Sequence, residues 1–193
     1  MLKFRRVYES VLLNLISLES SISQPGTQSY FRLLCLQAMG VKVKSPIWIA
    51  EDTWILNPRN LTFGSRVCIG ESSKIVCHTP IYIGDDFLSS SGLYINSGSH
   101  DIITLHPNSS PISIGKRVWC GMRVTICSGV SIGDNVVIGA GSLVTKSIPS
   151  GYLAYGVPAR PIRKIERDDQ ENIMIAFNYP SFWERLKSKI LGN

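Results

Sequence analysis

A six-residue period in residues 114–150 limits what this chain can fold into. Cut every six residues, the segment aligns with itself, and the first position of each hexad is Ile114, Cys120, Ile126, Ile132, Ile138 or Val144. The second position is mostly small: Gly115, Gly121, Cys127, Gly133, Gly139 and Thr145. This period fits neither an amphipathic helix nor an alternating strand. It is typical of a parallel β-helix, in which three hexads close one triangular coil and the first-position side chains stack inside.

The same period begins less regularly near residue 47. The in-phase residues are Ile49 and Ile55, then, after a slip of two residues, Phe63, Ile69 and Ile75, and, after another, Ile83, Ser89 and Ile95. We therefore predict repeats over 47–96 and 112–150, or about five coils stacked about 4.8 Å apart. Segment 97–111 keeps no hexad phase and is rich in Ser, Asn and Pro. We expect it to be a loop, the part of a solenoid that usually carries function.

The regions outside the repeats read as helical appendages. Apolar spacing predicts helices over 5–23 and 28–39, separated by Pro25-Gly26, and candidate helices over 168–177 and 181–190. The segment 151–170 is expected to be irregular in its first part because of Gly156, Pro158 and Pro161. The predicted division is a helical segment (1–45), a β-helix (46–150) and a C-terminal tail with a helix (151–193). The first helices should pack over the first coil, with a membrane surface as the alternative.

Composition narrows the setting without deciding the function. The formal charge of +6 suits an anionic cofactor, an acidic polymer or a membrane surface, but an ordinary surface bias gives the same number. None of the five cysteines forms a CxxC pair, which favours a reducing, cytoplasmic compartment. We find no secretory signal peptide and no apolar run long enough for a membrane span.

Four motifs, in this order and spacing, resemble the left-handed β-helix acyltransferases. They are 96–101 (NSGSHD), 114–121 (IGKRVWCG), 139–146 (GAGSLVTK) and 156–160 (GVPAR) with 162–164 (IRK). The chain is most similar to sugar and polysaccharide O-acetyltransferases, such as those for maltose, galactosides, nodulation factors and colanic acid. The resemblance implies an all-β, left-handed parallel β-helix, acetyl-CoA as co-substrate and no required metal. It also implies a homotrimer with active sites in the clefts between subunits.

The resemblance assigns the acceptor side of the site to the loop. His100 matches the catalytic histidine of the family, and histidine suits a general base because its ordinary pKa lies near neutrality. Asp101 either orients the loop or binds sugar hydroxyls. Glu71 and Ser72 stand where maltose acetyltransferases carry an acceptor-binding Asn one coil before the histidine, so they are candidate acceptor ligands. We expect His106 to be a loop residue and His78 to be structural.

The resemblance also assigns a coenzyme side. The candidate coenzyme ligands are Trp119, Gly121, Met122, Ala140, Thr145, Lys146, Arg160 and Arg163. The two arginines match basic positions near the phosphates, where guanidinium groups make bidentate contacts. Met122 departs from the Ser or Gly of some relatives.

The sequence therefore predicts an acetyl-CoA-dependent O-acetyltransferase with a carbohydrate acceptor and no nucleic-acid partner. The predicted role is in the biosynthesis of surface polysaccharide (O-antigen, capsule or exopolysaccharide), in the cytoplasm, with the inner face of the membrane as a candidate location. Alternatives left open are an N-acetyltransferase of an amino sugar, a non-catalytic β-helix scaffold, and a zinc hydratase of the γ-carbonic anhydrase type. The last would need all three histidines as zinc ligands.

Overall fold

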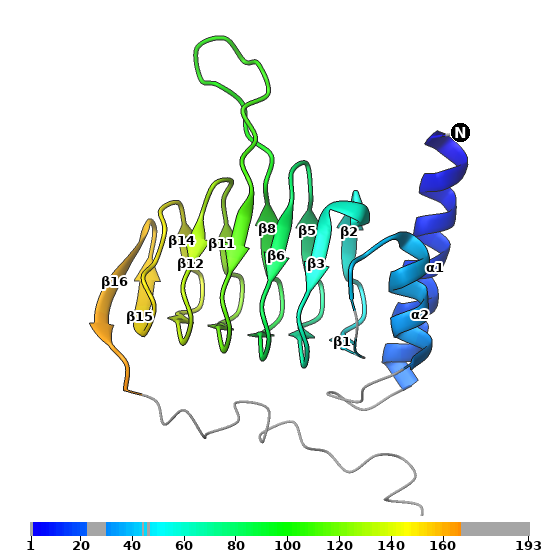
Figure 1. The fold of residues 1–193 in the computed structure, drawn as a ribbon, viewed down its shortest axis with the longest axis horizontal. Helices are drawn as coiled ribbons and strands as arrows, with labels where there is room; N and C mark the ends of the chain where they lie inside the picture. The colour runs from blue at the N-terminus through cyan, green and yellow to red at the C-terminus, as the bar shows by residue number, and fades with distance from the viewer. Residues whose placement is uncertain (1, 23–29, 44, 46, 167–193) are drawn as a thin grey trace, which may run out of the picture.

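The structure is a computed structural model that describes residues 2–22, 30–43, 45 and 47–166, with side chains of 2–6 and 20–22 excepted. It shows a β-solenoid of about five turns that begins with two helices (Figure 1). The predicted β-helix architecture is thereby confirmed. The candidate helices at 168–177 and 181–190 lie outside the described residues.

Three sheets form the faces of the solenoid; they are parallel except for the β15–β16 pair, and each of the first four coils contributes one strand to each sheet. The longest sheet contains β1 (Trp48–Ile49), β4 (Cys68–Ile69), β7 (Leu88–Ser89), β10 (Trp119–Cys120), β13 (Val137–Ile138), β15 (Tyr152–Gly156) and β16 (Ala159–Lys164). The five-stranded sheet contains β2 (Trp54–Leu56), β5 (Lys74–Val76), β8 (Tyr94–Asn96), β11 (Thr125–Ile126) and β14 (Leu143–Val144). The four-stranded sheet contains β3 (Leu61–Phe63), β6 (Ile81–Ile83), β9 (Ile112–Ile114) and β12 (Ser131–Ile132). A 3-10 turn, η1 (Pro58–Asn60), precedes β3.

The in-phase residues form the core, as the period predicts. Ile55, Ile75 and Ile95 pair in register along the five-stranded sheet and are buried. The two-residue slips are also confirmed, because Trp54 pairs with Lys74, twenty residues on. After the loop the coil shortens to the ideal eighteen residues, as in the pairing of Thr125 with Leu143.

The small second position of each hexad answers to close packing between coils. A Cβ atom on Gly115 would lie 2.3 Å from the Asp134 Oδ1 atom and 2.8 Å from the Asp134 backbone nitrogen. On Gly121 it would lie 2.7 Å from the Ala140 backbone nitrogen. These corners therefore exclude larger side chains whatever their backbone preference.

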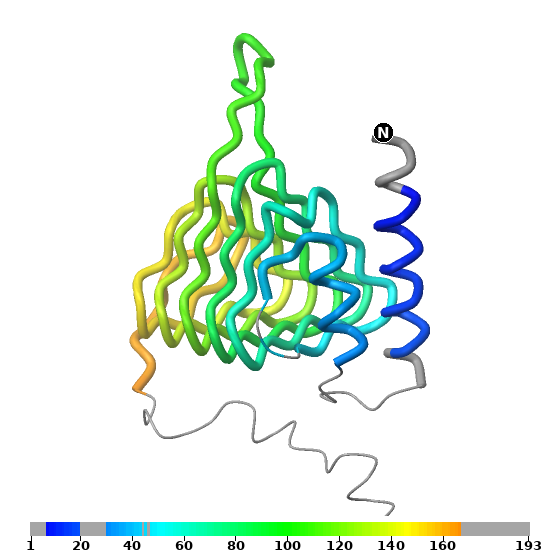
Figure 2. Tube along the Cα trace, turned by 45° about the vertical axis from the view of Figure 1, so that its right-hand side comes forward, coloured from blue at the N-terminus to red at the C-terminus, as the bar shows by residue number. Residues whose placement is uncertain are grey.

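Helices α1 (Leu2–Ile22) and α2 (Tyr30–Met39) close the first coil, which confirms the predicted packing. Both lie at the end of the solenoid that carries β1 (Figure 2). Their buried residues share one apolar cluster with the first strands: Leu13, Ile16, Leu33, Leu36, Ile47 and Ile49. The open edge of the first coil is thus covered by helix.

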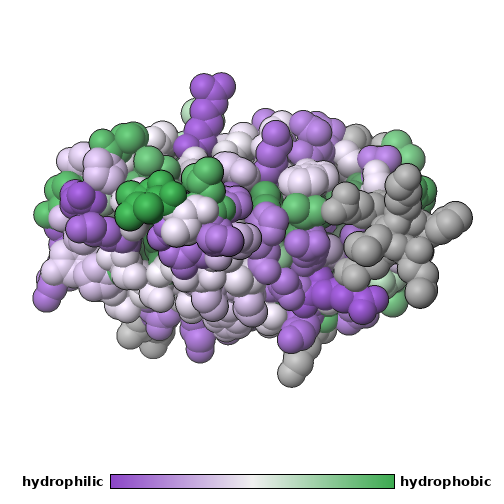
Figure 3. Space-filling model, turned by 90° about the horizontal axis from the view of Figure 1, so that it is seen from above, coloured by the Kyte–Doolittle hydropathy of each residue, from purple (hydrophilic) through white to green (hydrophobic). Residues whose placement is uncertain are grey.

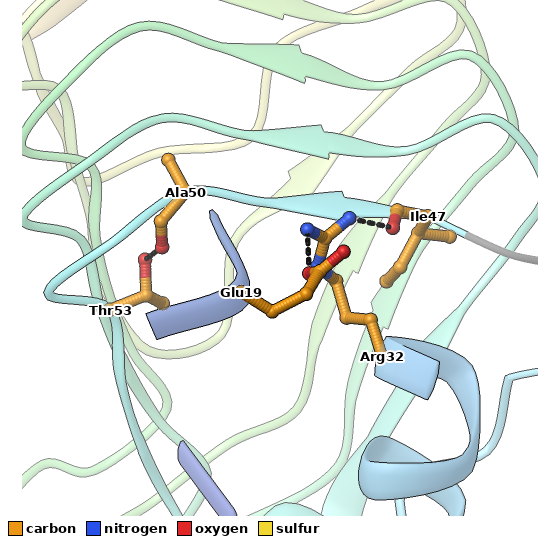
Figure 4. A network of polar contacts seen from close by, with 5 residues as sticks. All are labelled: Glu19, Arg32, Ile47, Ala50 and Thr53. Atoms are coloured by element: carbon orange, nitrogen blue, oxygen red, sulfur yellow. Dashed lines mark hydrogen bonds and ion pairs between the residues drawn. The ribbon is translucent and has the colours of Figure 1, made fainter. Parts of the chain in front are cut away.

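Arg32 ties the two helices to the solenoid. Its side chain is fully buried, forms an ion pair with Glu19 of α1 and donates to the Ile47 carbonyl oxygen at 3.2 Å (Figure 4). The guanidinium also lies 4.5 Å from the centre of the Trp48 ring. Burial lowers the pKa of Arg32, and the charge of Glu19 opposes that shift. The buried cation is tolerated because carboxylate, carbonyl and ring all face it.

The segment predicted to be irregular, 151–170, is described as far as residue 166, and this part contains an antiparallel hairpin of β15 and β16. Strand β15 continues the longest sheet beyond β13, and β16 pairs with its outer edge. Pro158 follows a cis peptide bond in the turn, and Pro161 lies on the edge strand, where a missing N–H costs little. The prediction was wrong because both prolines occupy positions that a hairpin accepts.

Candidate active site

The loop at 97–111 leaves the solenoid between β8 and β9 and protrudes well beyond the coils (Figure 1). It folds back on itself: the Asp101 N–H donates to the His106 carbonyl oxygen and the Asn108 N–H to the Ser99 carbonyl oxygen, both at 2.8 Å. His100 forms an antiparallel bridge with Pro107. The loop is therefore a hydrogen-bonded arm that presents His100 near its root.

Ser128 fastens the two ends of the arm to the next coil. Its hydroxyl donates to the Ser97 carbonyl oxygen at 2.9 Å and accepts from the Ser110 N–H at 2.8 Å. Both stems are thus held against the corner that follows β11. His100 lies only three residues beyond the fastened Ser97, so the solenoid fixes its backbone position.

A cavity of about 220 Å³ opens beside the root of the arm. Its lining residues come from β8, the arm and the coil that follows: Tyr94, Asn96, Gly98, Ser99, Thr125, Ile126, Cys127 and Ser128. His100 follows the lining residue Ser99 and is exposed. The lining includes hydroxyl and amide side chains, and the next residue along the arm is an exposed histidine, which is a residue type suited to general-base chemistry on a bound hydroxyl.

His78 also lies at the root of the arm, which the sequence did not predict. A Cβ atom on Gly98 would lie 2.4 Å from the Cδ2 atom of the His78 ring. The signal was present in the coil length, because His78 precedes Gly98 by the twenty residues of one coil. The structure therefore places a second imidazole beneath the arm that carries His100.

Asp101 caps the turn at the start of the arm. Its carboxylate oxygen accepts from the Ile103 N–H at 3.0 Å, from the Thr104 N–H at 2.8 Å and from the Thr104 hydroxyl at 3.0 Å. These bonds, first those from Thr104, lower the pKa of Asp101. Of its two predicted roles, the structure supports orientation of the loop, while sugar binding stays a prediction.

Glu71 and Ser72 lie away from His100 within one subunit. They occupy the corner before β5, whereas the arm follows β8. The two positions therefore lie at opposite ends of the strands in the five-stranded sheet. Glu71 accepts from the Ser91 hydroxyl at 3.0 Å, and Ser72 donates to Asp52 at 3.2 Å. A contact of these residues with the acceptor stays a prediction that calls for a neighbouring subunit.

Most of the candidate coenzyme residues form one strip on consecutive coils. Trp119 and Met122 are exposed, Gly121 lies against Ala140, and the Gly141 N–H donates to the Met122 carbonyl oxygen at 2.8 Å. Arg160 joins the strip through β15, because it pairs with Tyr155, whose Cβ lies 2.8 Å from a Cβ built on Gly139.

Thr145 and Lys146 lie at the opposite end of the strands in the five-stranded sheet, where the arm also leaves the solenoid. They follow β14, and the Cys127 N–H donates to the Val144 carbonyl oxygen at 3.0 Å, so they stack beside the cavity lining. Arg163 pairs with Leu153 across the terminal hairpin and is exposed. The coenzyme candidates thus lie in two places: the strip lies where the strands of the five-stranded sheet begin, and Thr145 and Lys146 lie where they end, on the side of the arm.

The cysteines near the site are poor nucleophiles. Burial raises the pKa of Cys77 to about 12 and also raises the pKa of Cys127, which lines the cavity. Little thiolate is therefore present at neutral pH. Within the described residues, no group of three or more His, Cys, Asp or Glu side chains is arranged to hold a metal ion.

An exposed column on the five-stranded sheet leads to the cavity. Trp54, Lys74 and Tyr94 pair in register on three consecutive coils and all are exposed. Tyr94 is also part of the cavity lining. The two aromatic side chains provide apolar surface and the lysine between them provides a positive charge, and this column reaches the candidate site.

Comparison with known proteins identifies the class to which this fold and site belong. A sequence profile for the hexapeptide repeat of succinyl-transferase matches residues 111–146. Galactoside O-acetyltransferase of Escherichia coli (strain K12) is 39% identical over 133 residues, which cover 63% of this chain and 66%, just under two thirds, of that enzyme. A putative colanic acid biosynthesis acetyltransferase of the same organism is 34% identical over 136 residues, which cover 69% of this chain and 75% of that protein.

The solved structures agree with the sequence relatives. A galactoside acetyltransferase in complex with coenzyme A matches with a TM-score of 0.64 and 30% identity, covering 86% of this chain and 82% of that chain. The chain belongs to the hexapeptide-repeat acetyltransferase family. The resemblance that the four motifs predicted is confirmed.

Proposed function

We propose that the chain transfers an acetyl group from acetyl-CoA to a sugar hydroxyl, with His100 as the general base. The observation that carries the proposal is the fastened arm, on which the exposed His100 directly follows the cavity-lining residue Ser99 in an acetyltransferase fold. A family member with the same fold binds coenzyme A, which supports acetyl-CoA as the donor.

The transfer is a direct attack on the thioester. The acceptor oxygen bonds to the acetyl carbon while His100 takes the hydroxyl proton, which leaves a tetrahedral oxyanion for backbone N–H groups to stabilise. Collapse breaks the carbon–sulfur bond, and the departing thiolate takes the proton from the imidazolium. A positioned base contributes about 10²–10⁴ in rate. No serine or cysteine nucleophile is needed, in line with the raised pKa of Cys127.

The exposed strip along the later coils is the proposed coenzyme surface. Trp119 and Met122 offer an apolar edge to the pantetheine arm. Ala140 is exposed and carries only a methyl side chain, so the coenzyme can approach its backbone closely. Gly121 is buried and its N–H donates to the Ile138 carbonyl oxygen at 2.8 Å, so its proposed role is to leave room for the coenzyme. Arg160 and Arg163 provide exposed guanidinium groups for the phosphates. Thr145 and Lys146 complete this surface on the side of the arm.

The proposed acceptor is a sugar of a surface polysaccharide or of its lipid-linked precursor, handled at the cytoplasmic side of the membrane. The relative from colanic acid biosynthesis supports this choice. The column of Trp54, Lys74 and Tyr94 supports it as well, since aromatic side chains pack well against the apolar faces of sugar rings. Acetylation of an amino sugar at nitrogen is the second candidate, because the same base and cavity serve an amine.

We also propose a homotrimer with the site in a cleft between subunits. The tip of the arm supports it, because Ile102, Ile103 and Leu105 are 90%, 86% and 72% exposed. Apolar side chains so exposed are stabilised when a neighbouring subunit covers them. Sedimentation of the purified chain should give a trimer, and a stable, active monomer would contradict the cleft.

The function is tested by incubating the purified chain with acetyl-CoA and a panel of sugars and amino sugars. Release of the coenzyme thiol and mass spectrometry of the products report the reaction. We expect acetyl esters on sugar hydroxyls that hydrolyse in mild base. Base-stable amides would favour N-acetylation instead. Absence of transfer to glycans extracted from cells lacking the gene, with coenzyme binding intact, would favour a scaffold.

A further inference from the structure

The outward faces of the two N-terminal helices are apolar. In α1 the exposed large side chains include Val7, Val11, Leu15 and Leu18, at spacings of four, four and three residues. They form a stripe on the side opposite the buried Leu13 and Ile16. A surface helix normally carries charged side chains there, so this helix is apolar on two sides.

The second helix continues the same surface. Tyr30, Phe31 and Leu34 are exposed on α2, opposite its buried Leu33 and Leu36. Over the described side chains of 7–19 and 30–39, the only charged residues are Glu9, Glu19 and Arg32, and none of them belongs to the exposed class. Glu19 and Arg32 pair with each other, and Glu9 lines the groove between α1 and β2. We call the exposed side chains of α1 and α2, from Val7 to Leu34, the helical face.

The position of the helical face indicates what covers it. Both helices lie at one end of the solenoid, and α1 forms the outermost layer there (Figures 1 and 2). In the proposed trimer, neighbouring subunits meet at the sides of the solenoid, so the three helical faces remain uncovered and point the same way. Three apolar faces on one side of an assembly suit a flat surface, because binding at several points multiplies weak affinities.

The charge around the helical face favours anionic lipid over a second copy. Lys3, Arg5 and Arg6 lie in the first turns of α1, and Lys42 and Arg59 are exposed beyond the end of α2. A second copy packed face to face would bring like charges together, whereas anionic headgroups attract them. On the side of the molecule from which the arm rises, hydrophobic areas are separated from one another by polar ones (Figure 3).

We propose that the helical face is a membrane-docking surface, which lies on an anionic lipid bilayer with its apolar side chains at the boundary of the acyl chains. No helix among the described residues is long and apolar enough to cross a membrane. The proposal rests on the proposed trimer for its avidity and would bring the enzyme to lipid-linked acceptors.

Vesicle flotation of the full chain tests the docking surface. The probes are vesicles of equal parts phosphatidylcholine and phosphatidylglycerol, and vesicles of phosphatidylcholine alone. We expect binding to the mixed vesicles that weakens in high salt. The double substitution Val11→Gln with Leu18→Gln should weaken binding at least about tenfold, because two large apolar side chains no longer enter the interface. The matched control, Ser10→Gln with Asn14→Gln, puts the same residue on the same helix and should bind as the wild type does.

The outcomes separate docking from catalysis. Wild-type protein that ignores mixed vesicles, or a Val11/Leu18 variant that binds as tightly as the control, overturns the proposal. A third result would also overturn it: the wild type does not bind vesicles, and the Val11/Leu18 substitution changes the sedimentation coefficient. That result would show that a second copy covers the helical face. If that variant fails to fold, Leu34→Gln in α2 replaces it. Acetyl transfer to a soluble sugar without vesicles should be unchanged, so a failed docking surface leaves the proposed function standing.

Discussion

Two corners of the solenoid keep a constant spacing, and the third does not. Six residues separate Ile49 from Ile55 and likewise Ile69 from Ile75, and the corner between the four-stranded and the longest sheet keeps the same step. Between the five- and the four-stranded sheets, the step grows to eight residues from Ile55 to Phe63 and to nineteen from Ile95 to Ile114. We call this third corner the variable corner.

The variable corner carries the residues that we propose to act on the acceptor. The 3-10 turn η1, His78 and the arm with His100 all leave the coil there. Because the inward residues on either side remain in register, extra residues at this corner extend outward without disturbing the core. The constant corners cannot do this, since their glycines touch the next coil. The proposed acceptor site therefore lies where the repeat length can vary without disturbing the core.

Replacing the arm should separate activity from folding most completely. A variant in which 97–111 is replaced by a four-residue corner copied from 127–130 loses the base, so we expect acetyl transfer to fall by about 10²–10⁴. The melting temperature should change little, because the arm adds few buried apolar contacts.

Deleting Met122 at a constant corner is the opposite case. It shifts every following inward residue and should unfold the later coils, as circular dichroism would show.

Two glycine substitutions compare the corners at the scale of one methyl group. Gly115→Ala at a constant corner places its Cβ 2.8 Å from the Asp134 backbone nitrogen and should lower the free energy of unfolding by about 1–3 kcal/mol. Gly98→Ala at the variable corner meets the movable His78 ring, so stability should change less while kcat falls. Urea unfolding and steady-state kinetics measure both. A larger stability loss at Gly98 would contradict the distinction.

The coenzyme strip should respond separately from the arm. Replacing Arg160 and Arg163 with Gln removes two exposed charges that would face the phosphates, and we expect the KM for acetyl-CoA to rise about tenfold. The KM for the acceptor should stay within a factor of about two. Lys164→Gln, on the same strand, is the matched control. An unchanged coenzyme KM in the double variant would remove the arginines from the site.

The smallest effect is expected at the cap of the arm. Asp101→Ala loses the three hydrogen bonds that close the turn and should raise the acceptor KM about threefold, because the arm then samples more conformations. Asp101→Asn keeps an acceptor oxygen and should behave nearly as wild type. If Asn is as damaging as Ala, the carboxylate charge matters and direct sugar binding regains support.

The periodic parts of the molecule could be predicted from sequence, and its edges could not. Burial of Ile55, Ile75 and Ile95 follows from hexad phase alone, because a solenoid repeats one environment at a fixed interval. The terminal hairpin was missed since Pro158 and Pro161 break regular strands in most contexts. The assignment of Glu71 and Ser72 to the acceptor came from the family resemblance and stays a prediction, because one subunit alone does not bring them near His100. His78 was expected to be structural, and a count of one coil back from Gly98 places it at the root of the arm.

The central claim is that His100 acts as the base that takes the proton of the acceptor hydroxyl. The most direct test is the single-turnover rate of acetyl transfer by His100→Ala, compared with His106→Ala on the opposite stem of the same arm. We expect the rate of the His100 variant to be about 10²–10⁴-fold lower than that of the wild type. Its affinity for coenzyme A and its melting temperature should match those of the wild type. The His106 variant should be close to the wild type in rate, affinity and melting temperature. Near-normal turnover by His100→Ala would contradict the account.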